Sequence, residues 1–120
     1  MLYKKFYKIM NREEYRILLN DIVRFVDDFR RNPSFDKVRE GRSYTNDIAN
    51  AFYAGVVEIL AREQNINIPQ WVFHDKYYLP EPVFLGEFKG AEYRILIMLE
   101  TPLAFKIRNI FVGNNILERC

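Results

Sequence analysis

The sequence of 120 residues has few of the side chains from which catalytic and metal sites are usually built. It contains one His, one Cys, two Ser and two Thr. A zinc site needs three or four ligands, which one Cys and one His cannot supply. Cys120 is the last residue and is difficult to hold against a base, so a Cys nucleophile is not expected. We therefore predict no metal site, no cofactor and no enzymatic activity.

Long hydrophobic runs and a strong net charge are also missing. The longest apolar run, residues 95–99, is far shorter than the roughly 20 residues that a membrane-spanning helix needs. The net charge is +2, and Lys4, Lys5 and Lys8 contribute three positive charges, so the remainder of the chain is close to neutral. We expect no membrane association, and the single Cys favours a cytoplasmic location.

Hydrophobic and aromatic residues are abundant. They make up 49% and 16% of the chain, which is typical of a globular protein and not of a disordered one. A chain of this length fits one domain. We predict a single, mainly α-helical domain over residues 1–120, in which residues 1–10 form either a basic N-terminal arm or a short strand.

Two segments, about 12–31 and 47–64, have the three-and-four spacing of apolar residues that indicates an amphipathic helix. Asn46 or Thr45 is the N-cap of the second helix. This helix is apolar over a broad arc, so we expect it to pack centrally, and Gly55 in its middle indicates a close helix crossing. We expect the two long helices to lie antiparallel in a small bundle.

The second half of the chain is predicted to form shorter elements. Residues 91–100 contain a run of five apolar residues that fits either a buried helix or a buried strand, and the composition favours the helix. Thr101 as N-cap and Pro102 as first helical residue start a short helix that ends near Asn109. The aromatic, Pro-containing segment 71–88 is expected to wrap around the outside of the bundle.

Aromatic rings in this loop, with two polar residues nearer the C-terminus, form the candidate partner-binding site. Protein interfaces favour aromatic and Arg side chains. The candidate residues are Trp71, His74, Tyr77, Tyr78, Phe84, Arg108 and Asn109. For most of the rings the simpler interpretation is that they cover the helices, and Arg108 and Asn109 fit either a partner contact or a structural role.

Two kinds of candidate chemistry have less support. His74 precedes an Asp and has the type of side chain that serves as a general base, but no nucleophile accompanies it, so a half-buried loop residue is the simpler interpretation. Asp21 and Asp28 are seven residues apart on the first helix, and Asp36 and Glu40 are four apart. Such pairs can hold a divalent cation, although solvated helix faces have the same pattern.

Nucleic-acid binding is an alternative use of the positive charges. Lys4, Lys5 and Lys8 are suited to phosphate contacts, but no helix-turn-helix spacing accompanies them. A small DNA-binding transcriptional regulator is therefore the first alternative to a protein-binding function. A metal-dependent enzyme that works through carboxylates is the second.

The C-terminal part of the chain resembles a segment of small bacterial helical proteins. The resemblance covers residues 99–112 (LETPLAFKIRNIFV) with Asn115 and Leu117, and extends to Trp71 and residues 78–82 (YLPEP). Such proteins look like accessory or antitoxin-like partners, some of them associated with a nucleotidyltransferase-like protein or joined to a helix-turn-helix domain. The resemblance implies a second protein as partner, with a nucleotidyltransferase-like toxin as one candidate, and it supplies no catalytic motif.

These observations predict a non-catalytic protein-interaction module, antitoxin-like or accessory, in a bacterial toxin–antitoxin or defence system. Its expected mechanism is occlusion of the partner through an aromatic patch. The sequence leaves open whether the chain also forms a homo-oligomer.

Overall fold

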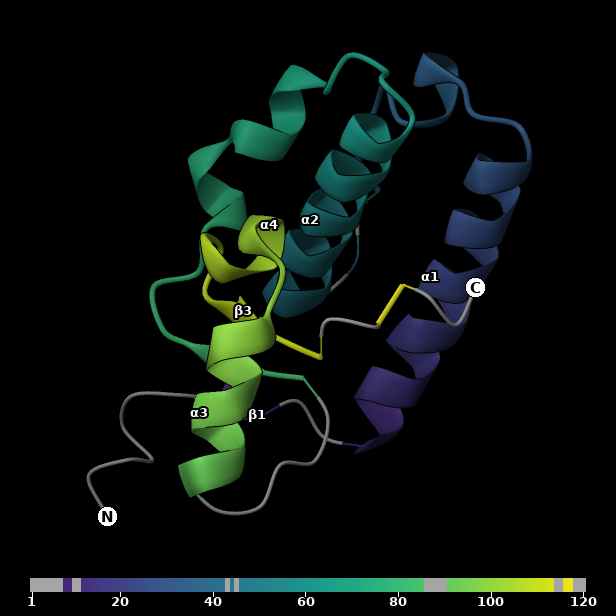
Figure 1. Cartoon of the computed structure of the whole chain (residues 1–120). Coiled ribbons are helices and arrows are strands. Elements are labelled where there is room, and N and C mark those ends of the chain that lie inside the picture. The colour runs from purple at the N-terminus through teal and green to yellow at the C-terminus, as the bar shows by residue number, and fades with distance from the viewer. Residues whose placement is uncertain are drawn as a thin grey trace.

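The computed structural model describes residues 8–9, 12–42, 44, 46–85, 91–113 and 116–117. Within these ranges the chain is mainly helical, which confirms the predicted class (Figure 1). The α-helices are α1 (Arg12–Arg31), α2 (Asp47–Glu63), α3 (Ala91–Glu100) and α4 (Leu103–Lys106). The shorter elements are the 3-10 helices η2 (Phe35–Lys37), η3 (Gln70–Phe73) and η4 (Asp75–Tyr77), and the strands β1 (Lys8–Ile9), β2 (Val83–Phe84) and β3 (Ile110–Phe111).

The helix α1 forms where the sequence predicts it and buries one face. The residues at three-and-four spacing supply this face, because Leu18, Ile22, Phe25, Val26 and Phe29 are all buried. Basic residues occupy the last turn, at the negative end of the helix dipole. The opposite face is polar and exposed, as expected of a helix that covers one side of a core.

The helix α2 is central, as its broad apolar arc predicts. Asn46 caps it, because its Oδ1 accepts hydrogen bonds from the backbone N–H groups of Ile48 (2.7 Å) and Ala49 (3.4 Å). Eleven of its 17 residues are buried. It lies between α1 on one side and η3 and η4 on the other, and α4 also packs against it (Figure 1).

The two long helices run parallel, so the predicted antiparallel arrangement is wrong. Near their first turns Asn46 Nδ2 lies 3.4 Å from Glu14 Oε2, and near their last turns Arg30 donates two hydrogen bonds of 2.9 Å to Glu63. The helices can run parallel because the connection over residues 32–46 is long. A helix of 20 residues rises about 30 Å, and 15 extended residues span up to about 50 Å, so this connection can return along α1.

Tyr44 fastens the returning connection to both long helices. Its backbone N–H donates to Asn50 Oδ1 on α2 (2.8 Å), and Asn50 Nδ2 donates to the carbonyl oxygen of Tyr44 (3.0 Å). Its hydroxyl donates to Asp21 Oδ2 on α1. The connection begins with η2, a predicted helical turn that Ser34 caps by accepting a hydrogen bond from the Asp36 N–H (3.2 Å).

A three-stranded parallel sheet joins segments from the start, middle and end of the chain. The strand order is β1-β2-β3. The register pairs are Lys8 with Val83, Ile9 with Phe84, Val83 with Ile110, and Phe84 with Phe111. The sequence predicts β1 as one of two alternatives for residues 1–10, and it predicts neither β2 nor β3. The rest of the predicted N-terminal arm, residues 1–7 and residue 10, lies outside the described residues.

Residues 91–100 are helical, which decides between the two alternatives for this segment. Ile97 of α3 packs with Phe84 and Phe111 in a small second core cluster, in which the two Phe rings stack at 5.3 Å between centroids. The segment 71–88, predicted to wrap around the bundle, covers α2 through η3 and η4, and its residues 86–88 lie outside the described residues.

The start of α4 differs from the prediction. Thr101 does not cap it, and Pro102 takes the N-cap position instead of the first helical one. The Thr101 hydroxyl lies 2.5 Å from the carbonyl oxygen of Ile97 and accepts a hydrogen bond from the Val112 N–H (3.2 Å). It therefore ties the last turn of α3 to the residue after β3. The helix also ends earlier than predicted, at Lys106, and Asn109 then turns with a left-handed φ of 64° into β3.

Gly55 allows Phe105 of α4 to contact the backbone of α2, which is the predicted close helix crossing. A Cβ atom at this position would lie only 2.6 Å from Cδ1 of Phe105. Replacing a mid-helix Gly by Ala normally stabilises a helix by about 1 kcal/mol. We expect Gly55→Ala instead to lower the free energy of unfolding by about 1–3 kcal/mol, because the fully buried Phe105 cannot move aside.

Denaturant unfolding followed by circular dichroism measures this change. Phe105→Leu should then lower the free energy of unfolding less in the Gly55→Ala background than in the parent chain. The reason is that the smaller side chain relieves the clash that Gly55→Ala creates. A Gly55→Ala variant that is more stable than the parent chain would show that the helices do not approach this closely.

Candidate functional site

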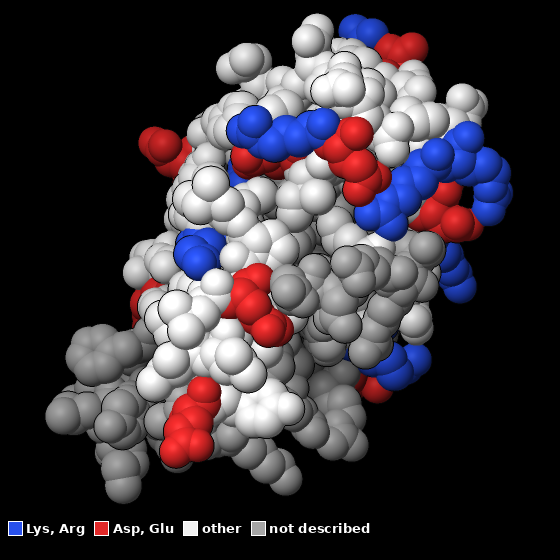
Figure 2. Space-filling view, in the orientation of Figure 1, with Lys and Arg blue, Asp and Glu red and all other residues white. Residues whose placement is uncertain are grey.

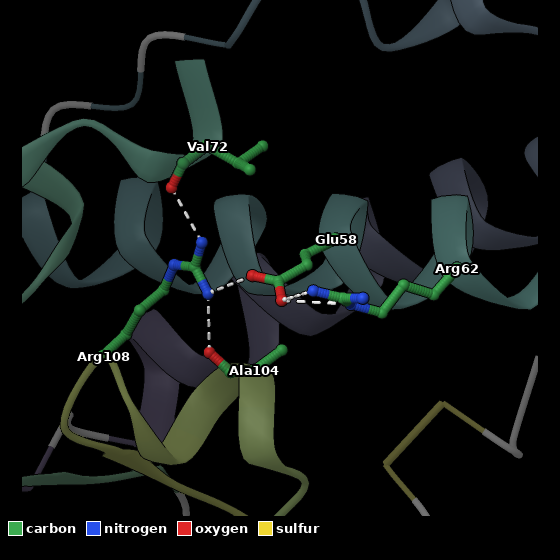
Figure 3. A network of polar contacts seen from close by, with 5 residues as sticks. All are labelled: Glu58, Arg62, Val72, Ala104 and Arg108. Carbon is green, nitrogen blue, oxygen red and sulfur yellow. Dashed lines mark hydrogen bonds and ion pairs between the residues drawn. The ribbon is translucent and has the colours of Figure 1, made fainter. Parts of the chain in front are cut away.

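A guanidinium group lies at the centre of the fold. Arg108 follows α4, and its side chain is completely buried. Its Nη1 donates to Glu58 Oε1 on α2 (2.8 Å) and to the carbonyl oxygen of Ala104 on α4 (2.7 Å). Its Nη2 donates to the carbonyl oxygen of Val72 in η3 (2.7 Å) (Figure 3). One side chain therefore connects α2, α4 and η3.

Glu58 compensates the buried positive charge. Its Oε2 accepts hydrogen bonds from Nε (3.3 Å) and Nη2 (3.1 Å) of Arg62, one turn later on α2. Arg62 is exposed, so the buried carboxylate lies between one cation in the core and one at the surface (Figure 3). Arg108 also lies over the ring of Tyr78, 4.9 Å from its centroid, which adds a cation–π contact.

Arg108 and Asn109 both hold the chain together. Arg108 has no exposed surface. Asn109 Nδ2 donates to the carbonyl oxygen of Leu79 (2.6 Å), and the Asn109 carbonyl oxygen accepts from the Val83 N–H (2.8 Å). The sequence left open whether Arg108 and Asn109 contact a partner or have a structural role. These hydrogen bonds give both residues a structural role.

Three of the candidate rings are used inside the fold. Trp71 is half-buried, stacks on Tyr53 of α2 with 5.8 Å between centroids, and donates from Nε1 to the carbonyl oxygen of Val38 (2.8 Å). Tyr77 is buried with its ring edge-on to Trp71 at 5.6 Å. Phe84 is buried in the second core cluster. These rings cover α2 and the sheet. This agrees with the simpler interpretation of the sequence, in which most of the rings cover the helices and do not bind a partner.

The remaining candidates lie in different places. His74 is exposed, and its Nδ1 accepts a hydrogen bond from the Lys76 N–H (3.2 Å), which caps η4. Lys4 and Lys5 lie outside the described residues, and of Lys8 only the backbone in β1 is described. Nucleic-acid binding through these three residues stays a prediction.

Exposed apolar side chains gather on α3 and α4, where the sequence predicted a buried run. Of the nine large hydrophobic residues that are exposed in the described part of the chain, seven lie here. We call them the α3–α4 surface: Tyr93, Ile95, Leu96, Met98, Leu99, Leu103 and Ile107. Figure 2 shows this side of the molecule, with a largely uncharged surface over α3 and α4 and isolated acidic and basic side chains.

The prediction that residues 95–99 are buried is wrong for four of the five. Ile97 faces the sheet and is 5% exposed, whereas Leu99 is 73% exposed. A run of consecutive apolar residues covers all sides of a helix, and the small sheet contacts only one of them. This surface is the functional candidate that the sequence analysis missed, and the run itself was the signal for it, because a helix that is apolar all round needs a second covering.

The candidate carboxylate Asp21 lies in a cluster between α1 and the returning connection. It accepts hydrogen bonds from the Tyr44 hydroxyl and from Nη1 of Arg42 (2.9 Å). The Arg42 guanidinium also lies over the ring of Phe25, 4.9 Å from its centroid. Burial, assisted by the hydrogen bond to Asp21, raises the pKa of Tyr44 to about 12.

Two of the other candidate carboxylates, Asp28 and Asp36, have basic neighbours. Asp28 pairs with Lys37 (3.1 Å) and Asp36 pairs with Arg39. Among the described residues, no group of three Asp, Glu, His or Cys side chains lies close enough together to hold a metal ion. In the same part of the chain, no helix combines the length and the apolar character needed to cross a membrane.

Comparisons with protein-family models, with curated proteins and with solved structures find no match to this chain.

We expect Arg108→Met to lower the free energy of unfolding by about 3–5 kcal/mol, because Glu58 Oε1 and the carbonyl oxygens of Ala104 and Val72 all lose the hydrogen bonds of the buried guanidinium. Arg62→Met removes the exposed partner of the same carboxylate and should cost about 1 kcal/mol or less. Denaturant titration measures both. The double variant Arg108→Met/Glu58→Met should be more stable than Arg108→Met alone, and equal losses for Arg108→Met and Arg62→Met would contradict the central role of Arg108.

The raised pKa of Tyr44 predicts a loss of stability at high pH. The folded state keeps the phenol proton up to a pKa of about 12, whereas the unfolded state loses it near the ordinary value of 10.0. The protonated Tyr44 phenol therefore stabilises the folded state fully below pH 10. This stabilisation disappears as the pH rises through 12. Because Tyr44 is only half-buried, we expect a loss of about 1–2 kcal/mol over this interval. Denaturant titrations at several pH values measure the free energy of unfolding of the parent chain and of Tyr44→Phe. The difference between the two should become smaller as the pH rises from 10 to 12. A difference that stays constant would contradict the raised pKa of Tyr44.

Proposed function

We propose that this protein is a non-catalytic protein-interaction module that binds its partner through the α3–α4 surface. The observation that carries the proposal is the concentration of exposed Leu, Ile and Met side chains on α3 and on residues 103–107 that follow it. Contiguous apolar patches on a folded chain usually mark interaction sites. The core of an interface is apolar and depleted of charge, which describes this surface.

The free energy gained by burying these apolar side chains supports a binding function for the α3–α4 surface. Leu99 and Leu103 are 73% and 71% exposed. Burying a Leu side chain completely is worth about 1.5–3 kcal/mol, so these two residues alone would contribute several kcal/mol to binding. Association costs at least about 4 kcal/mol in lost freedom, so a stable complex has to cover most of the α3–α4 surface. An extended, flat contact such as a packed helix meets this requirement.

An accessory or antitoxin-like role in a bacterial two-component system is the finer form of this proposal. It is supported by the resemblance of residues 99–112, which include α4 and Leu99 and Leu103 of the α3–α4 surface. Occlusion of a partner then takes place through aliphatic side chains, because Trp71, Tyr77 and Phe84 are engaged in the fold. The single Cys supports a cytoplasmic location.

Site-specific photocrosslinking in the cells from which the chain comes tests the proposal. A photoreactive residue at position 96 should form a protein adduct, whereas one at the exposed position 24 on α1 should not. Introducing Leu99→Glu should abolish the adduct from position 96, because a carboxylate in the centre of an apolar contact is desolvated without a partner. Equal labelling from both positions, or no adduct from position 96, would overturn the proposal.

A further inference from the structure

We infer that a cavity between the first halves of α1 and α2 binds a linear aliphatic diamine, with one ammonium group at Glu14 and the other at Asp21. The cavity has a volume of about 480 Å³, which lies in the range of small-molecule sites. The residues that line it belong to segment 14–49, whereas the α3–α4 surface belongs to segment 93–107. The inference therefore goes beyond the proposed function.

The middle of the cavity is apolar. Ile17 and Leu18 of α1 and Ala49 of α2 line it. Leu18 and Ala49 are buried, whereas Ile17 is 57% exposed. In the described part of the chain, Ile17 and Phe73 are the two exposed large hydrophobic residues that lie outside the α3–α4 surface. An exposed Ile at the wall of a cavity favours a ligand with a hydrocarbon part, because the ligand removes this side chain from water.

A carboxylate lies on either side of this apolar part. Glu14 and Asp21 both line the cavity and are seven residues apart on the continuous helix α1. Seven residues are close to two full turns, so the two residues share one face and are separated by about 10 Å along the helix axis. Ile17 and Leu18 lie between them. The sequence of acidic, apolar and acidic groups is complementary to a chain that is positive at both ends and apolar in between.

The Asp21 carboxylate is held in place with one oxygen available. Both hydrogen bonds that it accepts, from the Tyr44 hydroxyl and from Arg42 Nη1 (2.9 Å), end at Oδ2. The side chain is 44% exposed. Oδ1 can therefore accept a hydrogen bond from an ammonium group while both contacts of Oδ2 persist. Because Arg42 compensates part of the negative charge, we expect a dissociation constant of roughly 0.1–1 mM.

The Glu14 side of the cavity is more open. Glu14 is exposed, and its Oε2 lies 3.4 Å from Asn46 Nδ2 at the start of α2. An ammonium group at this position stays partly hydrated, so its ion pair with Glu14 adds only modestly to the affinity. The position of Glu14 instead determines which length of diamine fits.

The separation of the two carboxylates selects the ligand. An extended aliphatic chain advances by roughly 1.2 Å per bond, so about six to eight methylene groups between the two nitrogen atoms match a separation of about 10 Å. A shorter diamine reaches one carboxylate only. A charged nitrogen in the middle of the chain, as in spermidine, would lie on the apolar part of the cavity and lose its hydration. The geometry therefore fits a diamine with an uninterrupted hydrocarbon chain.

Isothermal titration calorimetry of the full chain at pH 7 and low salt tests the inference. Both amino groups are then protonated, since aliphatic amines keep their proton up to about pH 10. One molecule of 1,8-diaminooctane should bind per chain, and octylamine should bind about fivefold more weakly because it lacks the second ammonium group. 1,3-Diaminopropane and spermidine should bind at least about tenfold more weakly. An affinity that does not depend on chain length, or the absence of saturable binding up to about 10 mM, would overturn the inference.

Two neighbouring carboxylates on α1 supply a matched pair of variants. Glu14→Gln should lower the affinity for 1,8-diaminooctane about fivefold and leave that for octylamine unchanged, because the single ammonium group of octylamine lies at Asp21. Glu13→Gln removes the same charge from a residue that pairs with Arg16 (2.6 Å) and does not line the cavity, so it should change neither affinity. Equal losses in the two variants would show unspecific attraction of cations and overturn the site.

The apolar part of the cavity is tested through Ile17. Ile17→Ser should lower the affinities for 1,8-diaminooctane and octylamine by a similar factor, roughly threefold, because both ligands lie against this side chain. The residue is exposed, so the variant should fold as the parent chain does, which circular dichroism verifies. Unchanged affinities in folded Ile17→Ser would place the ligand elsewhere and overturn the inference.

Discussion

The ion pair between Arg108 and Glu58 is the interaction on which the arrangement of this fold depends. A guanidinium that is removed from water has to find a counter-charge and acceptors for its N–H groups, because burying it unpaired costs several kcal/mol. Nη1 and Nη2 of Arg108 find them on α2, on α4 and in η3, whereas its buried Nε has no hydrogen-bond partner among the described residues. These segments are distant in sequence, so the pair fixes their relative positions more narrowly than non-directional hydrophobic contacts would.

The exposure of α3 follows from this central constraint. With α4 held against α2 by Arg108 and by the contact of Phe105 with Gly55, the chain before it has to leave the core at Thr101. Thr101 joins the end of α3 to the residue after β3, so α3 lies against the sheet and away from α2. The sheet has two residues in each strand, and its Phe84 and Phe111 pack with Ile97 of α3. Ile95, Leu96, Met98 and Leu99, on the other faces of α3, therefore remain exposed.

The sequence predicted the local features of the fold well and the long-range ones poorly. The long helices were predictable because caps, apolar spacing and terminal charges agree within each segment. Their parallel direction depends on contacts such as those of Tyr44 with Asp21 and Asn50, which join separate elements of the fold and leave no periodic signal in the sequence. Strands of two residues are too short to show alternation, so β2 and β3 could not be recognised.

The candidate site was harder to predict for a related reason. Arg108 resembles any exposed basic residue in sequence, and only its position opposite Glu58 makes it a core residue. The aromatic residues between Trp71 and Phe84 have the composition of an interface, but a ring that stacks on Tyr53 serves the core equally well. Composition identifies the side chains that can form an interface, and the topology decides which of them are left outside.

In this chain the topology packs Trp71, Tyr77 and Phe84 against the core and leaves mainly aliphatic side chains of α3 and α4 at the surface. This division determines the kind of contact that the protein can make. Aromatic anchors insert into pockets of a partner, whereas a row of Ile and Leu at helical spacing packs along another helix. The exposed aliphatic side chains of the α3–α4 surface therefore suit an apolar face of a partner better than a set of aromatic pockets.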